Sequence, residues 1–285
     1  CDKLVKELYF KIKYYYNSMN FKKLTIVIVT FKSEEKISNC LKSIPSEISV
    51  IVVENSNKEN FKKKIEQNFS NVKCILTGEN KGYSKANNIG LKLVKTKYAL
   101  ILNPDTILDK NAITNFLRSI GKIKDFWLIG PANDQMIDLD FKENHLKEVN
   151  NLKGFAIFFN LSKFNNEYFD ENFFLFFEEI DLCRKVKKNN GKIYLDKEII
   201  IKHEGGSSVR KTNTFELEKN RNWHWMWSTF YFQRKHKGFL LAFLIILPKF
   251  LSAFIKTLFY LIILNKKKKR YLFLQIKWYC KFYYW

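Results

Sequence analysis

Short apolar runs alternate with amphipathic stretches along the first hundred residues of the chain. The runs predict strands, and the first of them, LTIVIVT, is a β-branched apolar run typical of a buried strand, whereas the stretches between them have helical periodicity. The predicted strands are 24–30, 48–54, 72–76 and 98–103, and the predicted helices are 34–43, 58–69 and 82–95, the last with Ile89, Leu93 and Val94 on its apolar face. This alternation predicts an α/β fold with a Rossmann-like, mostly parallel central sheet flanked by helices.

The pattern is less regular after about residue 110. It predicts helices near 110–121, 178–189 and 215–235, and strands near 126–130, 154–159, 192–195 and 198–203. We therefore expect three regions: an N-terminal extension at 1–23, a globular domain at 24–236 with halves 24–110 and 111–236, and an apolar, basic helical appendage at 237–285.

The appendage is strongly apolar over residues 238–264 but carries Pro248, Lys249 and Lys256. A clean membrane span needs about 20 apolar residues with few charges. The segment therefore favours helices that lie in the membrane interface over a single tilted span. From Gly238 to the end there are nine Lys or Arg and no acid, and KKKKR at 266–270 suits anionic headgroups. We expect a peripheral membrane contact through this tail.

The whole chain is strongly basic, with a formal net charge of +22. Such a charge also suits nucleic acid. Lysine is spread along the entire chain, however, and no zinc-finger or RNA-binding motif is present. We therefore predict that nucleic acid is not a partner.

The cysteines and the N-terminal residues indicate the cellular compartment in which the protein works. The five cysteines are scattered without a CxxC pair, which argues against a zinc site of that kind and against a disulfide framework. A reducing compartment is then expected. The first twenty residues are charged and aromatic throughout, unlike a signal peptide.

Polar residues follow each of the first four predicted strands. In open α/β sheets ligands bind beyond the carboxyl ends of the strands, so these residues predict a ligand crevice. They are Thr30, Lys32, Glu54, Asn55, Glu79, Asn80, Gly82, Asn103, Pro104, Asp105 and Thr106. The G-x-G-x-x-G and P-loop fingerprints are missing. A nucleotide can still be held if Glu54 accepts hydrogen bonds from a base edge, the Asn80–Gly82 turn approaches a ribose or phosphate, and Asp105 binds a hard divalent cation. The NPDT segment also fits an ordinary turn.

The stretch FFLFFEEIDLC, residues 173–183, places Glu178, Glu179 and Asp181 directly after an aromatic run. Acids in the first turn of a helix are favoured by the helix dipole, which is one interpretation. The other is a catalytic base beside an apolar wall, because burial and crowding raise the pKa of a carboxyl and make it a better base.

Six segments occur together and in order: TIVIVTFKSEEKISNCLKSI, IVVENSN, ENKGYSKANNIG, LILNPDT, FFLFFEEIDLC and IIIKHEGGSS. In this combination the chain resembles the family 2 glycosyltransferases of GT-A fold, in particular the rhamnosyltransferase-like branch, over about residues 24–236. The resemblance implies a half that binds a nucleotide sugar, a half that binds the acceptor, and inversion of the anomeric centre.

The resemblance also implies residue roles. Glu54 takes the position of an Asp that contacts the nucleobase, and Asn103-Pro104-Asp105 matches the metal-binding DXD position with Asp105 as its carboxylate. Glu179 takes the position of the catalytic Asp, and His203 matches a histidine that helps to hold the metal or diphosphate. The other implied positions are Asn80, Gly82 and Asn87 beside the nucleotide sugar and Gly154, Glu178 and Asp181 on the acceptor side.

The resulting prediction is an inverting glycosyltransferase at the cytoplasmic face of the cell membrane. It would move a sugar from a nucleotide-diphosphate donor, dTDP-rhamnose or a UDP-sugar, to a glycan or lipid-linked acceptor in cell-surface polysaccharide synthesis. Glu179 would be the base, and Mg²⁺ or Mn²⁺ would bind at Asp105 with His203 nearby, helped by basic residues within 205–211. The alternative is a catalytically inactive homologue that acts as a membrane-associated binding or scaffold subunit.

Overall fold

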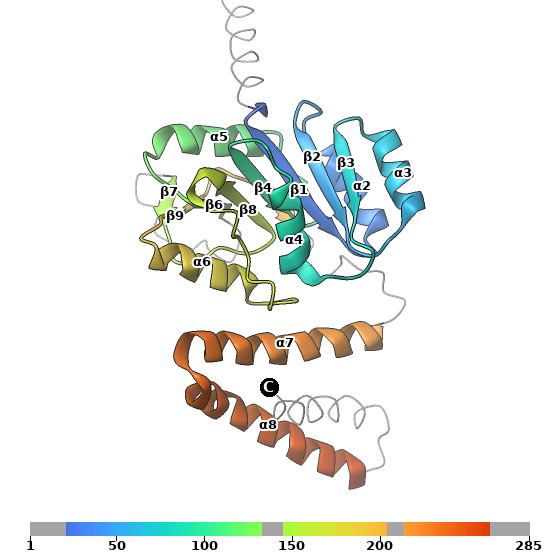
Figure 1. Cartoon of the computed structure of the whole chain (residues 1–285), viewed down its shortest axis with the longest axis vertical. Coiled ribbons are helices and arrows are strands. Elements are labelled where there is room, and N and C mark those ends of the chain that lie inside the picture. Colours follow the sequence, from blue (N-terminus) through green and yellow to red (C-terminus); the bar gives the residue numbers. More distant parts are fainter. Residues whose placement is uncertain (1–20, 133–144, 204–213, 263–285) are drawn as a thin grey trace, which may run out of the picture. The chain divides into compact units, whose positions relative to one another are not determined.

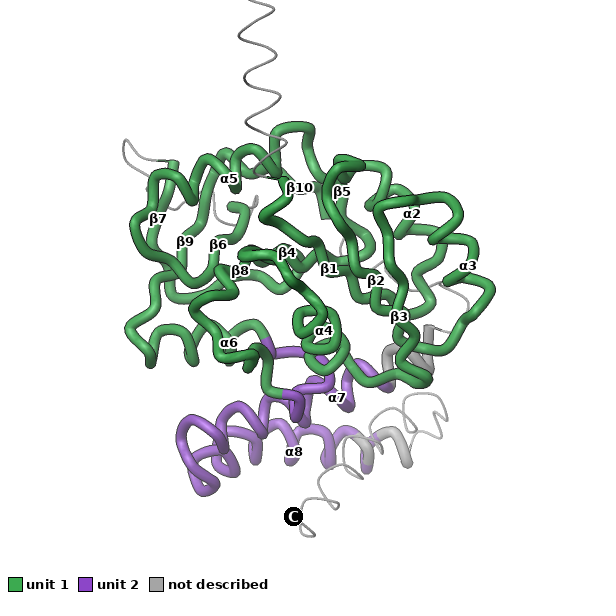
Figure 2. Tube along the Cα trace, turned by 45° about the horizontal axis from the view of Figure 1, so that its top comes forward, with its two compact units in different colours: residues 1–170, 179–210 green, residues 171–178, 211–285 purple. Residues whose placement is uncertain are grey.

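The structure is a computed structural model that describes residues 21–132, 145–203 and 214–262 (Figure 1). The chain divides into two compact units, which Figure 2 distinguishes by colour. Unit 1 comprises residues 1–170 and 179–210, and unit 2 comprises residues 171–178 and 211–285. The predictions for residues 1–20, 205–211 and 263–285 lie outside the described residues.

The centre of unit 1 is an eight-stranded sheet with the order β3-β2-β1-β4-β8-β6-β9-β7. Its strands are β1 (Leu24–Thr30), β2 (Ser49–Glu54), β3 (Val72–Leu76), β4 (Tyr98–Leu102), β6 (Leu128–Pro131), β7 (Leu146–Glu148), β8 (Ala156–Asn160) and β9 (Ile193–Asp196). The first four strands are parallel to one another, as is the β6–β9 pair. β8 is antiparallel to both neighbours and β7 to β9, so the sheet is mixed but mostly parallel.

Helices cover both faces of this sheet, which confirms the predicted fold class. Because side chains alternate along a strand, each strand contributes to two hydrophobic clusters. In β1, Leu24, Ile26 and Ile28 belong to the cluster with α2 (Glu34–Lys42), α3 (Glu59–Asn68) and α5 (Ala112–Lys122). Val27 and Val29 belong to the cluster with α4 (Gly82–Lys92) and α6 (Glu178–Lys188).

The apolar face predicted for residues 82–95 is confirmed in part, because Ile89 and Val94 are partly buried against the cluster of Val27 and Val29. Leu93, expected on that face, is 44% exposed and lies beyond the last helical residue. The helix instead approaches the sheet through Gly90, where an added Cβ would lie only 2.4 Å from Cγ1 of Val27 and 3.1 Å from Cγ2 of Val53. The contact therefore needs a glycine, and the apolar periodicity of the sequence did not reveal it.

A small second sheet forms between two short strands of unit 1. Strand β5 (Thr106–Leu108) pairs antiparallel with β10 (Ile201–His203), and the register places His203 opposite Thr106. β5 was not predicted, because three residues are too few to show a hydrophobic period. The pairing matters for the site, since it brings the end of β10 beside the residues that follow β4.

Unit 2 contains α7 (Thr214–Lys237) and α8 (Phe239–Ile262), which are joined at Gly238 with φ +84°. Met226 and Phe230 of α7 pack with Ala242 and Ile246 of α8. The expected separate interfacial helices are one uninterrupted helix, α8, with Pro248 inside it. A helix persists through a proline when the surrounding turns keep their hydrogen bonds, since only one backbone bond is lost outright.

The aromatic segment that precedes α6 also belongs to unit 2 and lies against α7. The Ser228 hydroxyl donates to the Leu175 carbonyl at 2.7 Å. Phe176 and Phe177 adopt left-handed backbone conformations, with φ of +73° and +69°. Each such residue costs roughly 1–2 kcal/mol, and both rings contact Trp225, with ring centroids 5.2 and 5.3 Å away. This contact offsets part of that strain.

Candidate functional site

The site lies at the edge of the sheet where the first four strands end. β1, β2, β3 and β4 are parallel, so the polar residues that follow them share this edge. β8 runs in the opposite direction, and its first residue, Ala156, pairs with Leu102, the last residue of β4. The residues just before β8, Gly154 and Phe155, therefore join the same edge.

Asn55 forms the centre of a hydrogen-bond network at the end of β2. Its side-chain amide donates to the Asn80 side-chain oxygen at 2.9 Å and to the Gly82 carbonyl at 3.2 Å. Its side-chain oxygen accepts from the Lys81 amide at 2.9 Å and from the Thr77 hydroxyl at 3.1 Å. The side chain is buried and all of its hydrogen-bonding capacity is used, so the loop 77–82 is tied to β2.

Asn80 and Gly82 gain a defined geometry from this network. The Asn80 side-chain oxygen accepts from both Asn55 and the Gly82 amide, the latter at 3.1 Å. Gly82 begins α4 with φ +80°, a conformation that glycine adopts without strain. With its oxygen engaged twice, Asn80 is oriented to present its amide as a donor, which suits an acceptor oxygen on a ligand.

Glu54 is buried, and its carboxylate holds the loop that leads into α3. It accepts from the Ser56 hydroxyl and from the backbone amides of Asn57 at 2.7 Å and Lys58 at 3.0 Å. These contacts are a structural role that sequence reasoning did not assign. The contact of Glu54 with a nucleobase stays a prediction. The base would have to share the Glu54 carboxylate with the loop that it already holds.

The structure brings Asn103, Asp105 and His203 together. Nε2 of His203 lies 3.4 Å from Oδ1 of Asp105 and 3.4 Å from the Asn103 side-chain nitrogen. The imidazole stacks on the Phe155 ring, with centroids 4.7 Å apart and an interplanar angle of 9°. The β5–β10 pairing fixes the backbone on both sides of this group.

This group fits a divalent cation. Asp105 is buried, and among the described residues its Oδ1 has no hydrogen-bond partner. A buried charged oxygen in that condition is costly unless a cation or donor reaches it. Carboxylate oxygens suit Mg²⁺ and Mn²⁺, and an imidazole nitrogen such as that of His203 is a ligand type that suits Mn²⁺.

Glu179 lies in the first turn of α6 and packs against Gly154. A Cβ added to Gly154 would be 3.6 Å from the Glu179 Cβ and 3.8 Å from its carboxyl carbon. Burial raises the pKa of the Glu179 carboxyl above its ordinary value. Glu178 and Asp181, in the same helix turn and the next, are buried.

The remaining predicted residues occupy the same edge or the helix beside it. Thr30 is buried, and its carbonyl accepts from the Asn55 amide at 2.8 Å. Lys32 is exposed, with φ +55°, in the turn after β1. Asn87 is buried in α4 and donates to the Tyr83 carbonyl at 2.9 Å, while Pro104 is buried beside Asp105. Their contacts with a ligand remain predictions.

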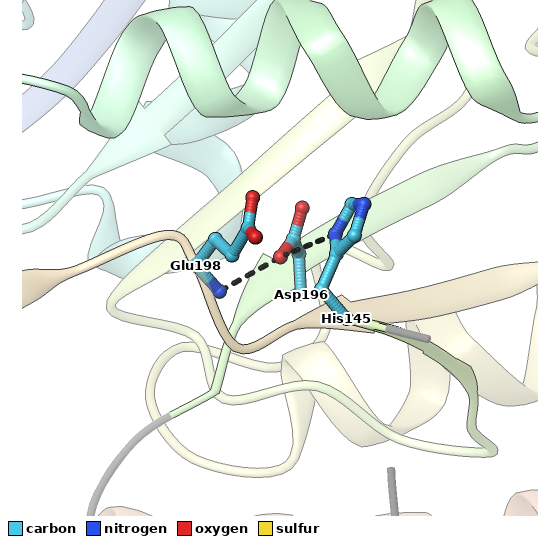
Figure 3. A group of neighbouring side chains, drawn as sticks. All are labelled: His145, Asp196 and Glu198. Carbon is cyan, nitrogen blue, oxygen red and sulfur yellow. Dashed lines mark hydrogen bonds and ion pairs between the residues drawn. The ribbon is translucent and has the colours of Figure 1, made fainter. Parts of the chain in front are cut away.

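A second group with metal-ligating atoms lies elsewhere in unit 1 and comprises His145, Asp196 and Glu198 (Figure 3). Asp196 Oδ1 is 3.1 Å from Nδ1 of His145 and accepts from the Glu198 backbone amide at 2.8 Å. Cations already flank the group: Nζ of Lys122 is 2.8 Å from His145, and Arg118 is 2.8 Å from Glu198. We interpret it as a structural network that joins α5 to the end of β9.

Three residues of the site had no individual role predicted from the sequence, namely Asn55, Tyr83 and Phe155. Asn55 was predicted only as one of the polar residues that line the crevice. The Tyr83 hydroxyl donates to the Gly154 carbonyl at 2.6 Å, and the Phe155 carbonyl accepts from the Asn103 amide at 2.9 Å. The position of Asn55 directly after a strand is a sequence feature that points to the site. The contacts of Tyr83 and Phe155 depend instead on segments that are far apart in the sequence.

The mostly parallel sheet, with acidic and amide side chains at its carboxyl edge, has the layout in which open α/β sheets bind their ligands. A family model described as glycosyl transferase family 2 matches residues 25–183, more than half of the chain. The chain belongs to glycosyltransferase family 2.

Two curated relatives act in glycan and teichoic acid synthesis by their names. The low-salt glycan biosynthesis hexosyltransferase Agl10 of Haloferax volcanii is 28% identical over 194 residues, which are 59% of this chain and 62% of that protein. The teichoic acid poly(glycerol phosphate) polymerase of Staphylococcus epidermidis is 31% identical over 132 residues, which are 41% of this chain and 18% of that protein. The chain thus matches less than two thirds of the length of either relative.

A solved structure shows the same fold. It is a mannosyltransferase from Pyrobaculum calidifontis in complex with GDP-Man and Mn²⁺. The two structures superpose with a TM-score of 0.55 at 12% identity, and the match covers 92% of each chain. The central sheet and its flanking helices therefore form a GT-A fold.

Proposed function

We propose that this protein is an inverting glycosyltransferase that moves a sugar from a nucleoside-diphosphate donor to a glycan or lipid-linked acceptor. One observation carries the proposal. A carboxyl with a raised pKa, Glu179, packs against Gly154, and the next residue, Phe155, stacks on His203, which pairs with Asp105. Inverting transfer needs both a base for the acceptor and a group that supports the leaving diphosphate.

In this mechanism Glu179 accepts the proton of an acceptor hydroxyl. The oxygen forms a bond with the anomeric carbon from the side opposite the leaving group, and the bond between that carbon and the diphosphate oxygen breaks. The electron pair of the broken bond remains on the nucleoside diphosphate. A general base of this kind contributes typically about 10²–10⁴-fold, and the raised pKa of Glu179 makes its carboxylate a stronger base.

Asp105 and His203 would hold Mg²⁺ or Mn²⁺, which when bound neutralises charge on the diphosphate. Asn103 and the Asn80 amide would orient the donor. We assign residues 24–110 to the donor and 111–236 to the acceptor within a catalytic domain at 24–236. The donor classes that we favour are dTDP-rhamnose and UDP-sugars, in cell-surface polysaccharide synthesis.

We also propose that α8 binds the cytoplasmic face of the cell membrane as a peripheral contact. Within the described residues, α8 is the one helix long and apolar enough to cross a membrane by length and composition. Leu240, Leu244, Leu251, Ile255 and Leu258 are exposed and recur with helical spacing on one side of it. Lys249 and Lys256, two turns apart, favour the interface, because their ammonium groups can reach the headgroups.

Thermal unfolding of the full chain with UDP, dTDP and GDP, each with and without Mn²⁺, tests the donor site. A ligand at about 100 times its Kd adds about 2.7 kcal/mol to the folded state. We expect one diphosphate to stabilise the protein, and to do so only with the metal. The matching nucleotide sugars are then tested for release of that diphosphate. If no diphosphate shifts a cooperative transition, the scaffold alternative replaces the enzyme.

A further inference from the structure

We propose that Tyr83 is a positioning residue for Glu179: its hydroxyl holds the Gly154 carbonyl and keeps the Gly154 backbone against the Glu179 side chain. The inference rests on the proposed role of Glu179 as the base. It gives a role to a residue that lies within the segment ENKGYSKANNIG but had none predicted, and it connects the loop 77–82 to the reacting carboxylate.

The first link is the hydrogen bond between Tyr83 and Gly154. The phenol oxygen is 2.6 Å from the Gly154 carbonyl oxygen, a short distance for a neutral donor and acceptor. Tyr83 is the second residue of α4, directly after Gly82, whose carbonyl is bound by Asn55. The start of α4 is thereby tied to the end of β2, and the phenol extends from it to the Gly154 backbone.

The second link is the contact between Gly154 and Glu179. A methyl group placed on Gly154 would touch three consecutive carbons of the Glu179 side chain at 3.6–3.8 Å. The backbone of Gly154 is therefore one wall of the space that Glu179 occupies. Moving this wall would admit water to the carboxyl and alter its orientation toward an acceptor.

The third link is Phe155, the next residue. Its carbonyl accepts from the Asn103 amide at 2.9 Å, and its ring stacks on His203. The Gly154–Phe155 segment is thus held by α4 through Tyr83, by the end of β4 through Asn103, and by the imidazole. Of these three, the Tyr83 bond is the one that acts directly on Gly154.

The test compares four full-length proteins: wild type, Tyr83→Phe, Tyr168→Phe and Glu179→Gln. Tyr83→Phe removes one oxygen and keeps the ring. Tyr168→Phe is the control, because Tyr168 is a buried tyrosine of unit 1 whose hydroxyl donates a long hydrogen bond, 3.4 Å, to Asn166. Each protein is measured for affinity toward the diphosphate with Mn²⁺, for kcat and KM across pH, and for unfolding free energy across pH.

We expect Tyr83→Phe to lower kcat about tenfold, as the loss of one well-formed hydrogen bond predicts, and to leave the diphosphate Kd within about twofold. The acid limb of its kcat profile should move to lower pH, because water that reaches Glu179 lowers the pKa of the carboxyl toward its ordinary value. Tyr168→Phe should match wild type in both respects. Wild-type kcat and an unmoved profile in Tyr83→Phe would overturn the inference.

The unfolding measurement separates this inference from the proposed function. If wild type turns over no donor, the proposed function fails, yet the pH dependence of unfolding relative to Glu179→Gln still reports the ionisation of Glu179. A pH dependence that Tyr83→Phe weakens and Tyr168→Phe does not would support the positioning role. Equal pH dependence in both tyrosine variants would reject it.

Discussion

Oδ1 of Asp105 lies 3.4 Å from Nε2 of His203, although the two residues come from distant parts of the sequence. The antiparallel pairing of β5 with β10 and the Phe155 ring hold this arrangement. Because Asp105 is buried and its Oδ1 has no hydrogen-bond partner among the described residues, a cation is the natural addition to the pair.

Asp105→Ala should weaken Mn²⁺-dependent binding of the diphosphate. Removing the carboxylate removes the only acidic ligand of the predicted site, so we expect affinity at least about tenfold lower at saturating Mn²⁺. Calorimetry with UDP and dTDP measures the effect. Asp125→Ala, which breaks only a surface pair with Lys163, is the control. Equal affinities for wild type and Asp105→Ala would remove Asp105 as a ligand.

Glu179→Gln should abolish transfer while donor binding survives. The amide keeps the size of the side chain but cannot accept the acceptor proton, so we expect turnover to fall by about 100-fold or more. Donor turnover and diphosphate affinity are measured side by side. Glu167→Gln, which removes a surface carboxylate paired with Lys185, should retain turnover. Near-normal turnover in Glu179→Gln would refute the assignment of the base.

The same carboxyl should give the protein a distinct pH dependence. Burial raises the pKa of Glu179 in the folded state, so the folded protein binds its proton more tightly than the unfolded chain does. Relative to Glu179→Gln, wild type should therefore lose stability as pH rises from the ordinary carboxyl range through the raised pKa. Denaturant unfolding at several pH values measures this difference, and a difference that is constant across pH would contradict the raised pKa.

The sequence predicted the first four strands well because each is a short, mostly apolar run between helical stretches, and β1 and β2 are buried, β-branched runs. It missed β5, which is too short to show a hydrophobic period, and the close approach of Gly90 in α4 to Val27. Within the site, motifs indicated Asp105, Glu179 and His203. The hydrogen bonds of Asn55 and Tyr83 depend on which loops meet in three dimensions, and no local pattern encodes that.

Asn55→Ala should destabilise unit 1 and weaken donor binding together. The substitution leaves the Lys81 amide without its acceptor and removes the donor to the Asn80 side chain and the Gly82 carbonyl, which frees the loop 77–82. We expect unfolding free energy to fall by about 2–4 kcal/mol, since several partly buried groups lose partners at once. Asn39→Ala, at an exposed position of α2, should change it by less than about 0.5 kcal/mol. An Asn55→Ala protein as stable as the control would show that the network is dispensable.

The exposed apolar side of α8 should determine membrane binding. Leu240, Leu244 and Ile255 are 69%, 51% and 63% exposed, and replacing all three with serine removes apolar area that would enter the interface. The full chain is sedimented with vesicles of neutral lipid alone or mixed with anionic lipid. We expect wild type to bind the anionic vesicles and to be released by high salt, and the triple variant to bind much less. The control, Leu93→Ser, changes an exposed apolar position of unit 1 and should bind like wild type. Binding of the triple variant at the wild-type level would locate the membrane contact outside α8. If wild type stays on the vesicles through salt and alkaline extraction, a spanning helix is favoured over an interfacial one.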